Sequence, residues 1–586
     1  MNLLRAMLVK LIYKDKYEIV DQNMSDSNVG ARKRKNIRNH VFILNGIINE
    51  ATKKKSEPVD IVVVDYEQCF DSLWLAECIN DLFDAGIKDD KLALIHKMNS
   101  VNQVAVKTPF GLTERKVVEE IVLQGEVFGP LECSVSIDTF GKECLNERKH
   151  LHMYKGEVGV PPLAMVDDVA CPAKCGLDSV EVTAFINSKT NSKKLRLGIE
   201  KCHQLHIGGK KDMCPDLCID NWGVKKCEEA KTGFDKLEDV FLGSHKMEGV
   251  DKEKYLGDIL PADRSNLKNI LARKDKSVGV TKQICSILED LCFGDFHFEV
   301  AIILRDSLLI NGILTNSEAW YHIREEELRI LEKCDESLLR KIYEAPITTP
   351  IPFLYLESGC KPIRFIIQAR RVMFLHYILN EDEGSLISRF LQAQAKNPNK
   401  DDWYLIILED LKYLEIFLDF EQIKSASKQQ FKDLVDESVE EKAYKYLVEK
   451  QKKMNKILSN EYSELKMEYY LKSSDINIRS KKFIFSARSR MLDVSSNYSN
   501  TATQTFCPVC KVSSNLDNQE HLLLCQKLST NQPVQEVLVY DDLLNGAVPK
   551  QIQIAAVLEA NFRLRKKLVK NSLQTESQVN LLCSPV

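Results

Sequence analysis

Three aspartates stand at places where short apolar runs end or turn. Asp65 follows the β-branched run 61–64, and the pair Asp167-Asp168 interrupts the apolar run 161–170. Hard carboxylate oxygens that converge from separate elements can hold two magnesium ions and leave coordination positions for phosphates and an attacking hydroxyl. The three residues are therefore candidates for metal-assisted phosphoryl transfer.

The elements around these aspartates are predicted to bring them together. Residues 61–64 are typical of a strand buried on both faces, and helical periodicity over 71–83 ends at Gly86. This strand, turn and helix present Asp65 at the carboxyl end of a strand, where α/β folds place their chemistry. The acidic pair predicts a tight turn between two strands, because Asp tolerates turn conformations.

A second group of residues has the spacing of a zinc site. Two cysteines on one tight turn, followed by a histidine and a cysteine one helical turn apart, can close a tetrahedral site: Cys507, Cys510, His521 and Cys525. The alternative is a set of buried cysteines with an unrelated histidine. Whether such a module touches nucleic acid or only stabilises the C-terminal region stays open at the level of sequence.

The composition is that of an ordinary globular chain. With 586 residues, 44% hydrophobic and 28% charged, it is expected to form several domains. The net charge of -4 is not typical of a nucleic-acid binder, although basic residues cluster at 32–38, 479–490 and 563–567. Eighteen cysteines without a secretory signal favour an intracellular location, nucleus and/or cytoplasm, and no apolar run predicts a membrane span.

Further elements follow from periodicity and turn residues. We expect a helix around 41–48 and a hairpin of 101–108 with 113–118 around Pro109-Phe110-Gly111. A long helical region covers 266–477, in which 424–464 is interpreted as one or two exposed helices, and 552–570 is helix-like. The close pairs Cys171/Cys175 and Cys214/Cys218 have no histidine at a convincing spacing and are interpreted as structural.

The ordered motifs resemble the palm of reverse transcriptases. They are Asp65 with an aromatic residue five positions on, a Gln-Gly turn at 124–125 that leads to a helix, and the Asp167-Asp168 hairpin. Residues 195–202 look like the next motif, and Lys254-Tyr255-Leu256-Gly257-Asp258 looks like the primer-grip hairpin. Glu318-Ala319-Trp320-Tyr321, the helical region and the Cys/His cluster are most similar to non-LTR retrotransposon proteins, with a resemblance from about residue 27 to 525.

The resemblance implies an α+β fold. It would be a right-hand polymerase of fingers and palm with a mostly α-helical thumb and C-terminal region and a small zinc module. The expected divisions are residual fingers 1–58, palm 59–260, helical thumb and connection 261–477, CCHC zinc module 478–530 and C-terminal tail 531–586.

The resemblance also implies roles for individual residues. Asp65 and Asp167 would bridge two Mg²⁺ ions, and Asp168 would be a further acidic contact of the metal site. Contacts to substrates and primer are expected from Phe70 as steric gate, Gln124, Gly125, Lys201, Arg32, Arg38 and the primer-grip residues Tyr255, Leu256 and Gly257. The implied activity is RNA-directed DNA polymerisation on an RNA template with a DNA primer and dNTPs. Zn²⁺ would occupy the Cys/His cluster.

The sequence departs from the family pattern at a few places. Leu123 stands where a basic residue often precedes Gln-Gly, and Glu126-Val127-Phe128 replaces the commoner acidic-Pro turn. Further finger motifs and an endonuclease domain have no counterpart, which suggests N-terminal truncation. The alternative is a catalytically inactive, truncated or domesticated nucleic-acid-binding protein. An RNA-directed RNA polymerase is disfavoured because Phe70 would clash with a ribose hydroxyl. Template and oligomeric state stay open.

Overall fold

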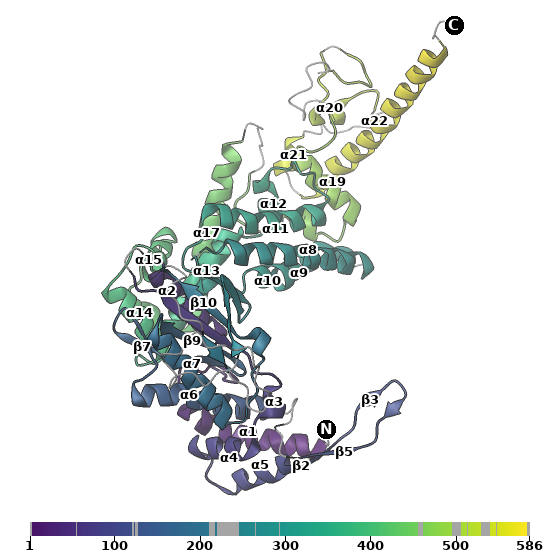
Figure 1. Cartoon of the computed structure of the whole chain (residues 1–586). Coiled ribbons are helices and arrows are strands. Elements are labelled where there is room, and N and C mark those ends of the chain that lie inside the picture. The colour runs from purple at the N-terminus through teal and green to yellow at the C-terminus, as the bar shows by residue number, and fades with distance from the viewer. Residues whose placement is uncertain are drawn as a thin grey trace.

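The structure is a computed structural model, and it divides into a sheet-containing part and a helical part. It describes residues 3–53, 56–119, 122, 127–209, 217–219, 245–263, 265–291, 293–454, 461–494, 506–512, 514–528, 540–545 and 548–582. Figure 1 shows the sheet with its helices at one end of an elongated molecule, a helical region in the middle and the C-terminal helices at the other end. This mixed α+β architecture agrees with the right-hand polymerase fold that the sequence predicts.

A five-stranded sheet in the order β13-β10-β1-β9-β8 forms the centre of the first part. Its strands are β1 (Val59–Val64), β8 (Leu163–Met165), β9 (Asp168–Lys174), β10 (His203–Ile207) and β13 (Glu248–Val250). β1 is antiparallel to both β9 and β10, and all six of its residues are buried, as its β-branched run predicts. Ile61 and Val63 belong to one hydrophobic core, whereas Val62 and Val64 belong to a second one. The sheet therefore separates two cores.

Seven helices in the described N-terminal part of the chain surround this sheet. They are α1 (Leu3–Asn23), α2 (Ile37–Ala51), α3 (Cys69–Ser72), α4 (Leu75–Asp84), α5 (Asp90–Ser100), α6 (Gly129–Glu147) and α7 (Leu177–Ser192). The helix expected over 71–83 is present as α4 but begins only at Leu75, because extended backbone at Leu73 and Trp74 separates it from α3. This break lets the Leu73 side chain reach the second core. Gly86, with φ +106°, follows α4 as predicted.

Short hairpins make up the remaining β-structure. The hairpin expected over 101–118 is present, with β2 (Val101–Val104) paired to β5 (Lys116–Glu119) and β3 (Lys107–Thr108) paired to β4 (Gly111–Leu112). It projects from the body of the molecule (Figure 1). The others are β6 (His152–Tyr154) with β7 (Val158–Val160), β11 (Cys218–Ile219) with β12 (His245–Lys246), and β14 (Lys252–Tyr255) with β15 (Asp258–Pro261).

The region predicted to be helical is helical. It contains α8 (Leu267–Asp290), α9 (His297–Leu304), α10 (Asn311–Ile313), α11 (Glu325–Tyr343), α12 (Ile351–Ser358), α13 (Ile363–Leu379), α14 (Leu386–Lys396), α15 (Trp403–Tyr413), α16 (Phe420–Ser425), α17 (Lys428–Lys452) and α18 (Tyr469–Lys472). The interpretation of 424–464 as merely exposed is wrong for α17. Phe431, Val435 and Val439 lie one turn apart and are buried, and the helix packs on α12 and α13.

The described residues of the C-terminal part contain four helices. They are α19 (Ile478–Arg488), α20 (Gln519–Leu524), α21 (Asp541–Asn545) and α22 (Val548–Leu582). The helix expected over 552–570 is thus present and extends further in both directions. Among the described residues, no helix combines the length and apolar character that a membrane crossing needs.

Candidate functional site

Asp65 lies where β1 ends, beside two other segments of the chain. Val64 pairs with Val169 in β9, which places Asp65 next to the start of that strand. On its other side, the Gly198 N–H donates to the Asp65 carbonyl at 2.9 Å, and Tyr66 pairs with Leu197. A Cβ atom on Gly198 would lie 2.8 Å from Asp65 Oδ2, so a larger residue here would displace the Asp65 carboxylate.

The acidic pair lies at the turn between β8 and β9, as predicted. Met165 pairs with Asp168, which leaves Val166 and Asp167 as the two turn residues. Val166 has φ +56°, in the left-handed region that a β-branched residue rarely adopts. A Cβ atom on Gly30 would lie 2.5 Å from the Val166 nitrogen, so the segment before α2 packs tightly against this turn. Such strain persists where surrounding structure fixes a functional site.

The three carboxylates interact electrostatically. The pKa of Asp168 is raised to about 6, mainly by burial and further by the negative charges of Asp167 and Asp65, whereas Lys201 and Lys254 oppose the shift. Clustered carboxylates that repel one another gain from a bound cation, and their hard oxygen atoms suit Mg²⁺. The residues present therefore fit a magnesium site.

Lys201 lies directly beside this cluster. Its Nζ is 3.1 Å from Asp65 Oδ2, and this hydrogen bond raises the pKa of Lys201. The Lys201 side chain is 71% exposed. Among the described residues, the three aspartates are not one of the groups whose ligand atoms all lie within 4.8 Å of one another. A two-metal site does not need this, because its ligand atoms are divided between two ions that lie about 3.5–4 Å apart.

Three further residues were expected to contact the nucleotide or the template: Phe70, Gln124 and Gly125. Phe70 lies in α3, half-buried against the second core. Gln124 and Gly125 lie outside the described residues.

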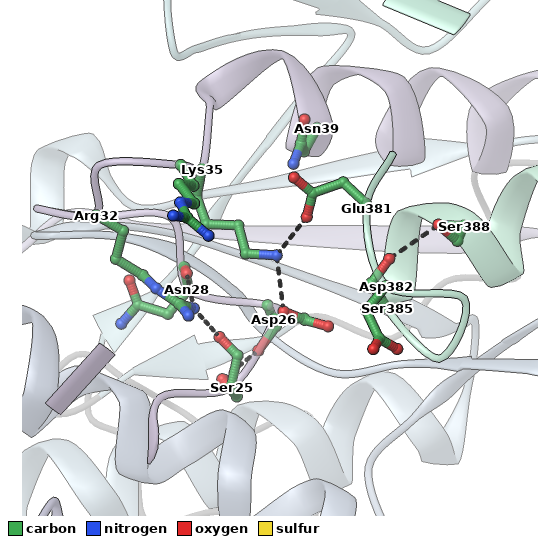
Figure 2. A network of polar contacts seen from close by, with 12 residues as sticks. Ser25, Asp26, Asn28, Arg32, Lys35, Asn39, Glu381, Asp382, Ser385 and Ser388 are labelled. Atoms are coloured by element: carbon green, nitrogen blue, oxygen red, sulfur yellow. Dashed lines mark hydrogen bonds and ion pairs between the residues drawn. The ribbon is translucent and has the colours of Figure 1, made fainter. Parts of the chain in front are cut away.

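The two arginines expected to meet a triphosphate are engaged by the chain itself. Arg32 donates to the Asp21 carboxylate at 2.6 Å and to the Ser25 carbonyl at 2.7 Å, and only 5% of its side chain is exposed. Figure 2 shows the Arg32 bond to Ser25 beside the ion pairs of Lys35. Arg38 lies 4.7 Å from the Tyr377 ring centre and pairs with Glu318. A triphosphate would have to displace these partners.

The predicted primer-grip hairpin is present as β14 and β15. Leu256 (φ +47°) and Gly257 (φ +85°) form its turn. The Tyr255 ring is buried, and the contact of this hairpin with a primer stays a prediction. The Tyr255 hydroxyl donates to the Leu163 carbonyl at 3.2 Å and lies 3.1 Å from His40 Nδ1. Tyr255 thus connects this hairpin to β8 and α2.

Asp258 is a structural centre that the sequence reasoning missed. This buried carboxylate accepts hydrogen bonds from Asn269, Arg273, Asn316 and Trp320, at 2.7, 2.7, 2.7 and 3.1 Å. Two features of the sequence could have indicated this role. An acidic residue directly follows Tyr-Leu-Gly, and the hydrogen-bond donors Arg273 and Trp320 lie in the apolar segments that come after it. Asp258 joins the hairpin to the helical region.

The predicted zinc ligands are brought together. The ligand atoms of Cys507, Cys510, His521 and Cys525 all lie within 4.8 Å of one another. Cys510 Sγ is 3.5 Å from His521 Nε2. Asn518 caps α20 by accepting from the His521 N–H, which fixes the histidine in the first turn of the helix. Three sulfurs and one imidazole nitrogen are a donor set that suits Zn²⁺.

Comparison with known proteins identifies the N-terminal domain of the chain. Residues 3–260 match the family model of reverse transcriptase (RNA-dependent DNA polymerase), so the domain is that of a nucleotidyltransferase. The match begins at residue 3 and includes α1, whereas the resemblance was expected from about residue 27.

The similarity to solved structures is low. Apo telomerase from Candida tropicalis is similar with a TM-score of 0.32 at 11% identity, over 74% of this chain and 61% of that one. Telomerase from Candida albicans with a fragment of telomeric RNA gives 0.31 at 11% identity, over 72% and 56%. The chain thus spans less than two thirds of either telomerase chain. No curated protein matches the sequence.

Proposed function

We propose that this chain, whose residues 3–260 form a reverse transcriptase domain, is an RNA-directed DNA polymerase that extends a primer 3'-hydroxyl with dNTPs. The observation that carries the proposal is the position of Asp65 at the end of β1 beside the Asp167-Asp168 turn, where burial and, to a lesser extent, the charges of Asp167 and Asp65 raise the pKa of Asp168. Carboxylates from two strands meet at one edge of the sheet, as phosphoryl transfer by two metal ions needs.

The proposed roles follow from these positions. Asp65 and Asp167 would hold two Mg²⁺ ions from separate elements, and Asp168 would add negative charge to the same site. When bound, the ions lower the pKa of the primer hydroxyl and balance the charge of the leaving pyrophosphate. Lys201 keeps its proton beside Asp65 and can present it to the triphosphate. Template bases choose the nucleotide, and the Phe70 ring rejects a 2'-hydroxyl.

The rest of the chain supports a non-LTR retrotransposon origin within the same proposal. We assign 1–58 to residual fingers, 59–260 to the palm, 261–477 to the thumb and connection, 478–530 to a Zn²⁺-binding module and 531–586 to a tail. The order of the motifs and the converging Cys/His ligands support this assignment. The proposed partners are an RNA template, a DNA primer and dNTPs, inside the cell in the nucleus and/or the cytoplasm.

Primer extension tests the activity. Oligo(dT) on poly(rA), with Mg²⁺ and labelled dTTP, is offered to the wild type and to Asp167→Ala/Asp168→Ala. We expect extension by the wild type and none by the variant. No extension by folded wild type that still binds the primer-template would overturn the proposal in favour of a catalytically inactive nucleic-acid-binding protein.

A further inference from the structure

Three potential metal ligands meet at the end of the sheet opposite Asp65. Asp60 lies in β1, His206 lies in β10, and Cys175 directly follows β9. Asp60 is paired with His206 on one side and with Ala173 on the other, and directly opposite residues share a face of the sheet. Cys175 lies two residues after Ala173 and returns to the same face.

The side chains themselves converge. The ligand atoms of Asp60, Cys175 and His206 all lie within 4.8 Å of one another. Asp60 Oδ1 is 3.0 Å from His206 Nδ1. Two ligand atoms at zinc-ligand bond lengths in a tetrahedral site are about 3.3 Å apart, so this spacing is close to what a shared ion needs.

The donor set indicates which ion would bind. Carboxylate oxygen, imidazole nitrogen and thiolate sulfur are all ligands that Zn²⁺ accepts, whereas Mg²⁺ prefers oxygen alone. The negative charges of Asp60 and an ionised Cys175 together neutralise a divalent ion. Asp60 is fully buried, and Cys175 and His206 are half-buried, so a water molecule can supply a fourth ligand from the exposed side.

We propose that Asp60, Cys175 and His206 form a second zinc site, distinct from the Cys/His cluster at the C-terminus. The ion would join β1, β9 and β10, which are three adjacent strands of the sheet. Two of these strands carry the polymerase carboxylates at their other ends, with Asp65 five residues, or roughly 16 Å, from Asp60. The site therefore fixes the register of the strands that position the active site.

Zinc stoichiometry of the full-length protein tests the proposal. Metal analysis of purified protein saturated with Zn²⁺ and then desalted is compared between wild type, Cys175→Ser, His206→Gln and Cys285→Ser. Cys285 is a half-buried cysteine of α8 and serves as the matched control. We expect Cys175→Ser and His206→Gln each to bind one zinc fewer per chain than wild type and Cys285→Ser. Equal zinc content in all four proteins overturns the proposal and leaves Asp60 and His206 as a hydrogen-bonded pair.

A measurement on the unaltered chain covers the case in which these variants fail to fold. The rate of alkylation of Cys175 by iodoacetamide is followed by mass spectrometry after chelation and after addition of Zn²⁺. We expect Zn²⁺ to slow the reaction of Cys175 at least tenfold and to leave Cys285 unchanged. Equal rates for Cys175 with and without Zn²⁺ contradict the site.

Discussion

At the scale of single residues, the polymerase site brings negative charges together at a cost in stability. Asp168 is half-buried beside Asp65 and Asp167, and this environment raises its pKa to about 6. An isolated surface carboxylate would have no such cost. This cost fits the proposed cation site, in which a bound metal would offset the repulsion that folding imposes.

Phe70 gives a residue-scale prediction about sugar selection. The ring lies in α3, just after Asp65, and a smaller side chain would leave room for a 2'-hydroxyl. We expect Phe70→Val to raise incorporation of ribonucleotides relative to deoxynucleotides by about 10²-fold or more, since a steric clash of a few kcal/mol is removed. Single-nucleotide insertion of UTP and dTTP measures the ratio.

Phe110→Val is the control, because its ring at the tip of the β3–β4 hairpin is fully exposed. It should leave the ratio unchanged. An equal ratio in Phe70→Val and wild type would show that Phe70 is only a packing residue.

The residues that could be predicted from sequence are those whose role depends on local position. Asp65 and the acidic pair lie at a strand end and a turn, and short-range patterns indicate both. The partners of Arg32 and Tyr255 could not be predicted, because Asp21, Leu163 and their other contacts come from distant segments. Asp60, Cys175 and His206 meet only through the register of three strands, which spacing along the chain does not reveal.

At the scale of elements, the β14–β15 hairpin links the sheet-containing part to the helical part through Asp258. Its two carboxylate oxygens bind side chains from α8 and from the segment before α11. Arg273 in α8 is buried beside it. The hairpin is therefore held in place by a charge pair and several neutral hydrogen bonds.

Removal of the Asp258 carboxylate should destabilise this junction strongly. Asp258→Ala leaves the Arg273 guanidinium buried without its anion, which typically costs about 3–5 kcal/mol of unfolding free energy. Urea unfolding of the full chain, followed by circular dichroism, measures the loss. Asp251→Ala is the matched control, because its side chain is 76% exposed where it pairs with Lys268, and we expect it to leave the stability nearly unchanged. Equal effects of both substitutions would contradict the role of Asp258.

A second buried network joins α12 to α19. Arg488 lies 2.9 Å from Glu357 and 3.2 Å from Glu468, and its guanidinium also donates to the carbonyls of Leu543 and Leu544. Burial, with a further contribution from the charge of Glu357, raises the pKa of Glu468 to about 7, whereas Arg488 opposes the shift. Glu357 and Glu468 therefore form ion pairs with the same arginine.

This network predicts a pH dependence of stability. The folded chain holds the Glu468 proton more strongly than the unfolded chain, whose ordinary pKa is 4.5. The stabilisation that this proton supplies is therefore present below pH 4.5 and is lost as the pH rises to about 7. We expect Glu468→Gln, which cannot ionise, to gain on the order of 2 kcal/mol relative to wild type between pH 5 and 8.

Urea unfolding at a series of pH values measures this difference. Glu464→Gln, at an exposed carboxyl paired with Lys466, is the control and should show no trend with pH. A difference between Glu468→Gln and wild type that stays constant from pH 5 to 8 would count against the raised pKa.

At the scale of the whole molecule, the C-terminal part is held together by the Cys/His cluster and by α22. Asn561 in α22 donates to the Leu522 carbonyl at 2.8 Å, and Arg565 pairs with the buried Asp517 at 2.6 Å. Loop 506–512 has little regular structure of its own. The proposed zinc ion is therefore expected to supply much of the folding energy of this module.

Loss of this metal site should unfold the module and spare the sheet-containing part. We expect Cys510→Ser/His521→Ala to lose one zinc per chain and to expose 506–528 to limited proteolysis, while residues 3–260 stay protected. Mass spectrometry of the tryptic fragments identifies the cleaved segment. Cys285→Ser is again the control. Unchanged protease resistance in the variant that has lost its zinc would show that α22 alone holds the module.

The overall architecture was predicted better than its internal contacts. Hydrophobic periodicity indicated the buried strand β1, the long helical region and α22, because each depends on patterns within one segment. The break between α3 and α4 and the burial of α17 depend on which core each segment meets, and no local pattern specifies that. The family match over 3–260 extends the domain to α1, whose sequence carries no catalytic motif.

The most direct test of the central claim is the rate of single-nucleotide incorporation by Asp65→Asn. The substitution keeps the shape of the side chain and removes one negative charge from the proposed metal site, and Glu67→Gln, an exposed acid two residues away, is the matched control. We expect Asp65→Asn to lose at least about 10²–10³-fold in rate, or about 3–4 kcal/mol of transition-state stabilisation, and Glu67→Gln to stay near wild type. Wild-type rates in folded Asp65→Asn would contradict the assignment of the active site.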